Sequence, residues 1–115
     1  MRVPVAAANW KCHTRLESAT ALARGLLQTI DGLEGVEKVV CPPFVYLFAV
    51  EVALRGSSIR LGSQDVHWED DVAATGEIGP QMVAELAQYA IIGPSARRHP
   101  FGETDEMVNR KVKAA

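Results

Sequence analysis

The chain has 115 residues and a mass of 12.5 kDa, with 48% hydrophobic residues, 23% charged residues and a formal net charge of −2. This length and apolar content fit one small domain, and the composition excludes collagen-like, disordered and disulfide-scaffold chains. The charge is nearly balanced and there is no run of Lys or Arg. We therefore expect neither nucleic acid nor a membrane as a partner.

The expected state of the two cysteines depends on the compartment in which the chain resides. No apolar stretch approaches the roughly 18 residues that span a bilayer, and the N-terminus lacks the pattern of a signal peptide, which predicts a cytosolic location. In that compartment we expect Cys12 and Cys41 to be free thiols. No Cys or His lies at zinc spacing from either, so we expect no metal and no other cofactor.

Short β-branched runs alternate with longer amphipathic segments four times, which is typical of βα units and a parallel sheet. Residues 3–8 predict the first strand. Thr14 and Glu17 then form a predicted capping box at the start of the first helix. Residues 36–41 predict the second strand, and Pro42-Pro43 favours a helix start directly after it.

The middle of the chain continues this alternation. We expect the second helix to run to about Arg55, and residues 59–63 predict the third strand. The loop that follows contains Glu69-Asp70-Asp71, which we interpret as a solvated loop rather than a cation site. Gly79-Pro80 then predicts the start of the third helix.

The last part of the chain predicts one more strand and helix. Residues 89–93 are wholly apolar, as expected for a strand covered on both faces. Thr104 is the predicted N-cap of the last helix, with Asp105 and Glu106 favourably placed in its first turn. No linker or low-complexity segment interrupts the pattern, so we expect residues 1–115 to form a single α/β domain.

Chemistry in a parallel βα fold collects in the loops after the C-terminal ends of the strands. The loop after the first strand reads Asn9-Trp10-Lys11. Residues two apart in an extended segment share a side, so Asn9 and Lys11 are placed to face a small anionic ligand while Trp10 packs inward. The tripeptide also fits an ordinary surface lysine beside a buried tryptophan.

Four sequence blocks extend this observation over essentially the whole chain. They are Ala8-Asn9-Trp10-Lys11, Cys41-Pro42-Pro43, Thr75-Gly76-Glu77-Ile78, and Gly93-x-Ser95-x-Arg97-Arg98 followed by Phe101-Gly102-Glu103-x-Asp105. In this order and spacing they resemble the triosephosphate isomerase family. The resemblance implies half of a TIM (β/α)8 barrel, with this chain supplying the first four parallel βα units of a fold that typically needs about 250 residues.

The resemblance also implies a reaction and a ligand. The family interconverts dihydroxyacetone phosphate and glyceraldehyde 3-phosphate in glycolysis by moving a proton between adjacent carbons. By this resemblance Asn9 and Lys11 are substrate-binding residues, and the ligand is a triose phosphate or another small phosphate ester. The family's carbonyl-polarising histidine is second in its Gly-His-Ser-Glu-Arg-Arg stretch. That position is Pro94 here, and the glutamate of the same stretch is Ala96.

These departures predict that no catalytic set is complete. Proline has no side-chain donor and no backbone N–H, so Pro94 cannot replace the histidine. His99 lies close in sequence but matches an ordinary position after the arginine pair. The family's glutamate base, its closing loop and its phosphate-binding loops follow later strands, so we expect them outside these 115 residues. The prediction is a pseudoenzyme that is inactive on its own.

A four-stranded parallel sheet leaves two bare edges and one bare face, which favour association. We therefore expect a homo-oligomer in which copies cover each other's sheets, since barrel closure removes edges. The resemblance implies a second contact, in which the Thr75-Gly76-Glu77 loop inserts into the neighbour near Cys12 and Arg97 lies near the partner's glutamate. The same residues also fit simple inheritance without use.

Two other functions remain open from the sequence. One is a non-enzymatic interaction or phosphometabolite-binding module that keeps the fold. The other is an enzyme subunit completed by a separate C-terminal half. Pro94 and Ala96 count against the second, because a complementary half would not restore the histidine.

Overall fold

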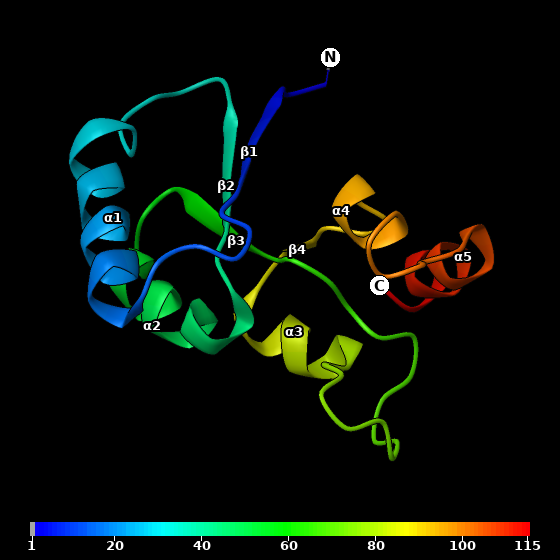
Figure 1. Cartoon of the computed structure of the whole chain (residues 1–115). Helices are drawn as coiled ribbons and strands as arrows, with labels where there is room; N and C mark the ends of the chain where they lie inside the picture. Colours follow the sequence, from blue (N-terminus) through cyan, green and yellow to red (C-terminus); the bar gives the residue numbers. More distant parts are fainter. Residues whose placement is uncertain (1) are drawn as a thin grey trace.

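The structure, a computed structural model, describes residues 2–115 (Figure 1). Strands and helices alternate in the predicted order, and within the described residues no helix is both long and apolar enough to cross a membrane. The elements are β1 (Val5–Asn9), α1 (Leu16–Thr29), β2 (Glu37–Cys41), α2 (Phe44–Leu54), β3 (Ile59–Ser63), α3 (Pro80–Leu86), β4 (Tyr89–Ala90), α4 (Ser95–Arg98) and α5 (Asp105–Ala114).

The four strands form one sheet in the order β1-β2-β3-β4, and every pair is parallel. In this register Asn9 lies opposite Cys41, and Ser63 lies opposite Ala90. The C-terminal ends of the strands therefore meet along one rim of the sheet. Four parallel strands with alternating helices form half of a (β/α)8 barrel, as the sequence predicted.

The hydrophobic core lies where α1 and α2, which are neighbours in Figure 1, pack on the sheet. Ala19 and Ala23 of α1 are fully buried, and their small side chains allow close approach of the helix. Val50 of α2 is also fully buried, in the same cluster as Val40 and Leu61 of the sheet. The core thus occupies the helix side of the sheet.

β1 is an open edge of the sheet. Within residues 2–115 it pairs only with β2, and all five of its residues are exposed. The Pro4 carbonyl and the Trp10 N–H are bonded to β2. Because backbone groups alternate in direction along a strand, Val5, Ala7 and Asn9 present their N–H and C=O groups to the free edge.

The radius of gyration and the accessible surface are both larger than expected for a compact domain, which agrees with a sheet that has an uncovered face. The Cα radius of gyration is 14.6 Å, against about 13 Å for a compact domain of this length. The accessible surface is 7565 Å², which exceeds the area of a folded monomer of this mass by roughly 1,400 Å². That excess is larger than the roughly 800 Å² that one partner contributes to a standard protein interface.

The predicted cap of α1 was wrong. Thr14 is not the N-cap: its φ is +80°, and its buried Oγ1 has no hydrogen-bond partner among the described residues. The N-cap is Arg15, whose backbone N–H donates to Ser18 Oγ at 2.8 Å. The helix starts after Thr14 because a residue with positive φ cannot adopt the extended conformation of an N-cap.

The fourth strand is shorter and more exposed than residues 89–93 predicted. Only Tyr89–Ala90 are assigned to β4, and Tyr89 is 38% exposed. Pairing ends because β3 itself ends at Ser63, whose carbonyl accepts a last hydrogen bond from the Ile91 N–H at 2.8 Å. The expected coverage on both faces is absent from the described chain, and the backbone turns away at Gly93, where φ is +67°.

Lys38 stabilises the opposite rim of the sheet. Its side chain is buried, and Nζ donates to the carbonyls of Ile30, Asp31 and Leu33 at 3.1, 3.0 and 2.6 Å. The ammonium therefore binds carbonyls of the segment that directly follows α1, where a cation is favoured near the helix C-terminus. Asp31 in turn accepts hydrogen bonds from Ser58, which precedes β3.

Candidate functional site

A cavity of about 410 Å³ opens at the C-terminal ends of the strands. All the residues that the sequence predicted for ligand binding, catalysis or oligomer contact line it, except Thr75. They are Asn9, Lys11, Cys12, Gly76, Glu77, Pro94, Ala96 and Arg97. Residues at or after the ends of β1, β3 and β4 are therefore brought together, as expected at this end of a parallel sheet.

The loop after β1 is held in an unusual conformation. Trp10 is buried, as predicted, and its N–H donates to the Cys41 carbonyl at 3.1 Å. Lys11 has a φ of +56°, and its N–H donates to Asn9 Oδ1 at 2.9 Å. Asn9 therefore positions the neighbouring lysine as well as facing the cavity, a role that the tripeptide alone did not indicate.

Pro94 and Ala96 also line the cavity, from the segment that follows β4. Pro94 is the N-cap of α4, with φ −67° and ψ 155°. Neither side chain carries a hydrogen-bond donor or a carboxylate. His99 is exposed at the C-cap of α4, outside the residues that line the cavity.

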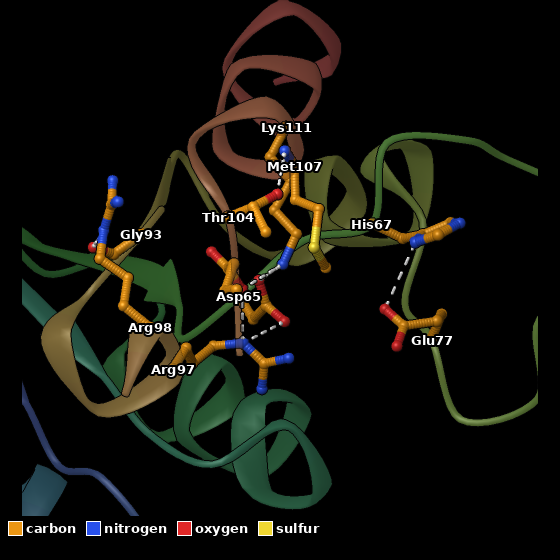
Figure 2. Close-up of polar contacts among 10 residues, drawn as sticks. Asp65, His67, Glu77, Gly93, Arg97, Arg98, Thr104, Met107 and Lys111 are labelled. Carbon is orange, nitrogen blue, oxygen red and sulfur yellow. Dashed lines mark hydrogen bonds and ion pairs between the residues drawn. The ribbon is translucent and has the colours of Figure 1, made fainter. Parts of the chain in front are cut away.

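Beside the cavity, Asp65, Arg97 and Lys111 converge from three segments of the chain (Figure 2). Lys111 Nζ lies 2.7 Å from Asp65 Oδ1 and 2.8 Å from Glu103 Oε2. Arg97 Nε lies 3.1 Å from Asp65 Oδ2 and 2.9 Å from Glu103 Oε2. Two positive and two negative side chains thus compensate one another. We call these four residues the ion cluster.

The ion cluster joins α5 to the rest of the domain. The side chains of Lys111 and Glu103 are 2% and 1% exposed, so an uncompensated charge there would be costly. Burial raises the pKa of Glu103, but hydrogen bonds from Lys111 and Arg97 outweigh burial and leave the pKa below its usual value. Glu103 is therefore held as a carboxylate, and the side-chain hydrogen bond to Glu103 raises the pKa of Arg97.

The Thr75-Gly76-Glu77 segment is an exposed turn next to the cavity, with Gly76 at a φ of +90°. Its base is held by His67, whose backbone N–H donates to the Ile78 carbonyl at 2.8 Å. His67 Nδ1 also lies 3.4 Å from Glu77 Oε2 (Figure 2). His67 is buried and lines the cavity. Sequence reasoning missed it, because it belongs to none of the four recognised blocks.

Both cysteines are free, as predicted. Cys12 is exposed and lines the cavity, whereas Cys41 is buried, and this burial raises the pKa of its thiol to about 11. A thiol with such a pKa is unreactive at neutral pH. Of the two, only Cys12 is therefore available for chemistry at the cavity.

The acidic loop has a structural role. Asp70 Oδ1 accepts a hydrogen bond from the Gln81 N–H at 2.9 Å, in the first turn of α3. Among residues 2–115 no group of three or more His, Cys, Asp or Glu side chains is arranged to hold a metal ion. Glu69-Asp70-Asp71 thus includes a contact to a helix N-terminus, an arrangement that favours a carboxylate.

The four parallel βα units and the cavity at the ends of their strands define half of a (β/α)8-barrel protein. The sequence model of triosephosphate isomerase matches residues 4–115. Triosephosphate isomerases from Dehalococcoides mccartyi strain BAV1, Carboxydothermus hydrogenoformans and Citrifermentans bemidjiense are 46%, 45% and 47% identical to the chain, respectively. Each match covers all of this chain and 46% of the relative. The chain therefore belongs to the triosephosphate isomerase family and spans about half the length of these relatives.

The ion cluster makes the stability of the domain dependent on pH. We predict that Glu103→Gln lowers the free energy of unfolding at pH 7 by about 2–3 kcal/mol, because Arg97 and Lys111 lose a charged acceptor. The folded-state pKa of Glu103 is lowered. The contribution of its carboxylate to the free energy of unfolding is therefore complete above the ordinary pKa of about 4.5, and it is lost as the pH falls through the lower folded-state pKa. The difference between wild type and variant should therefore narrow from about pH 5 to about pH 3, as measured by urea unfolding at each pH.

The matched control is Glu106→Gln. Glu106 pairs with Arg110 on the exposed surface of α5, with 74% of its side chain accessible. Its removal should change the free energy of unfolding by less than about 0.5 kcal/mol. A Glu103→Gln difference that stays constant down to pH 3 would show that the carboxylate charge is not what stabilises the ion cluster.

Proposed function

We propose that this chain binds a small phosphate ester through Asn9 and Lys11 and does not carry out its family's isomerisation. One observation carries the binding proposal: Lys11 lines the cavity and forms no ion pair within residues 2–115. The other cation on the cavity wall, Arg97, is already compensated by Asp65 and Glu103. An uncompensated lysine and a side-chain amide that line the same cavity suit a phosphate or another small anion.

The loss of isomerisation is supported by Pro94 and Ala96. The triosephosphate isomerase mechanism, as the sequence resemblance implies it, needs a histidine donor at the position of Pro94. An oriented donor of this kind contributes about 10²–10³-fold to the rate. His67 does not replace it, because its Nδ1 is directed at Glu77 and its ring lies apart from Arg97 and Asp65 in Figure 2.

The purified chain should show no isomerase turnover above background. The measurement is a coupled assay. Glyceraldehyde 3-phosphate is the substrate offered to the chain, and any dihydroxyacetone phosphate that forms is reduced in the second, coupled step. The matched control is the full-length Dehalococcoides mccartyi relative in the same assay. Turnover by this chain within tenfold of that control would contradict the proposed loss of catalysis.

Lys11→Met should weaken binding of glycerol 3-phosphate at least tenfold, which corresponds to losing about 1.4 kcal/mol of charge-assisted contact. The reason is that methionine keeps an unbranched side chain of nearly the same length but removes the ammonium. Calorimetric titration gives the dissociation constant. Lys113→Met, an exposed lysine on α5, is the control and should leave binding unchanged. Equal affinity of wild type and Lys11→Met would place the ligand elsewhere.

We further propose that the chain is a homo-oligomer in the cytosol. The open backbone groups of β1 and the excess accessible surface of roughly 1,400 Å² support association. The Thr75-Gly76-Glu77 turn and Cys12 are exposed, so these expected contact residues are accessible to a second copy. The free thiols of Cys12 and Cys41 fit a reducing compartment.

Ala7→Pro tests association through the free edge of β1. It removes an N–H that points away from β2 and leaves the β1–β2 hydrogen bonds in place. We expect wild type to be oligomeric at micromolar concentration and Ala7→Pro to dissociate at concentrations at least tenfold higher than wild type. Size exclusion with light scattering measures both. Ala7→Ser, which keeps the N–H, is the control, and a monomeric wild type at micromolar concentration would contradict the proposal.

A further inference from the structure

Lys11 has a backbone conformation that a lysine rarely adopts. Its φ of +56° lies in the left-handed region, which residues with a Cβ populate sparsely. Such outliers persist only where surrounding contacts determine them, and they concentrate at functional sites. The contacts that hold Lys11 are therefore informative about what the loop does.

Two side chains fix the backbone of Lys11, one on each side. Asn9 Oδ1 accepts the hydrogen bond of the Lys11 N–H at 2.9 Å. Gln64 Nε2 donates to the Lys11 carbonyl at 2.8 Å. Gln64 directly follows β3 and is 53 residues away in sequence, so this second contact depends on the fold and not on the local turn.

Gln64 is itself anchored to the sheet. The same Nε2 donates to the Cys41 carbonyl at 2.9 Å, at the C-terminal end of β2. The Cys41 carbonyl also accepts the Trp10 N–H at 3.1 Å. Gln64 therefore connects the ends of β2 and β3 to the loop after β1, and its amide uses both N–H donors in doing so.

We propose that Gln64 is a positioning residue that locks Lys11 in the left-handed conformation and so directs its ammonium into the cavity. This inference rests on the proposed binding of a phosphate ester by Lys11. Without Gln64 the Lys11 carbonyl loses its donor, and nothing from β3 restrains the loop. The backbone then relaxes toward negative φ, and the Lys11 side chain is no longer held in one direction at the cavity wall.

A ligand-free experiment tests the backbone part. Lys11→Gly and Lys11→Ala are compared in the wild-type and Gln64→Leu backgrounds by thermal unfolding. Glycine tolerates positive φ and alanine does not, so with Gln64 present the glycine variant should melt about 4–8 °C higher. With Leu at position 64 this advantage should disappear. An equal advantage in both backgrounds would overturn the proposal.

A second experiment tests the consequence for binding. Titration with glycerol 3-phosphate should show at least fivefold weaker binding by folded Gln64→Leu, although Lys11 is intact. Gln28→Leu, an exposed glutamine of α1, should bind like wild type. Unchanged affinity of Gln64→Leu would overturn the proposal. If Gln64→Leu does not fold, Gln64→Asn takes its place in both experiments, because its shorter side chain cannot reach both carbonyls.

The two experiments separate this inference from the proposed function. If wild type does not bind glycerol 3-phosphate, the proposed binding function is refuted. The proposed effect of Gln64 on ligand binding is then refuted as well. The glycine and alanine comparison would still establish whether Gln64 sets the conformation of Lys11. If wild type binds and the comparison shows no coupling to position 64, the binding function stands and the positioning role of Gln64 is refuted.

Discussion

The parallel register of β1 against β2 is the constraint on which the cavity depends. It places Asn9 beside Cys41, whose carbonyl accepts hydrogen bonds from both the Trp10 N–H and Gln64 Nε2. The ends of three strands are thereby joined at a single oxygen atom. A shift of one residue would turn the side chain of Asn9 to the other face of the sheet and break the contact between Gln64 and Lys11. The conformation of the loop is thus a consequence of strand pairing.

Local signals predicted the fold as far as local contacts determine it. The helix starts at Phe44 and Pro80 follow from the prolines and glycine around them, and β3 has the predicted bounds. The Thr14 cap was wrong because Thr14 has a φ of +80°, which residue preferences for N-cap positions do not reveal. The fourth strand was predicted too long because its length is set by the end of β3 at Ser63, and the composition of residues 89–93 carries no information about that partner.

The same distinction applies to the candidate site. Asn9, Lys11 and Pro94 could be placed from the sequence because they lie in recognisable blocks that follow strands. Lys111 could not, since a lysine on an amphipathic helix normally faces solvent, and its partner Asp65 is 46 residues away. Burial of a lysine becomes tolerable only when the fold delivers two carboxylates to it. No pattern within a single helix predicts that arrangement.

The residues that hold Lys11, for which we propose anion binding, and the residues at the family's histidine and glutamate positions come from different parts of the rim. Lys11 is held by Asn9 on its own loop and by Gln64 after β3, whereas Pro94 and Ala96 belong to the start of α4. Within residues 2–115 no hydrogen bond that fixes Lys11 passes through α4. A change at α4 that removes a hydrogen-bond donor therefore leaves the geometry of the lysine intact. This separation gives a physical reason why an anion site can persist in a chain whose isomerase chemistry, as we propose, is lost.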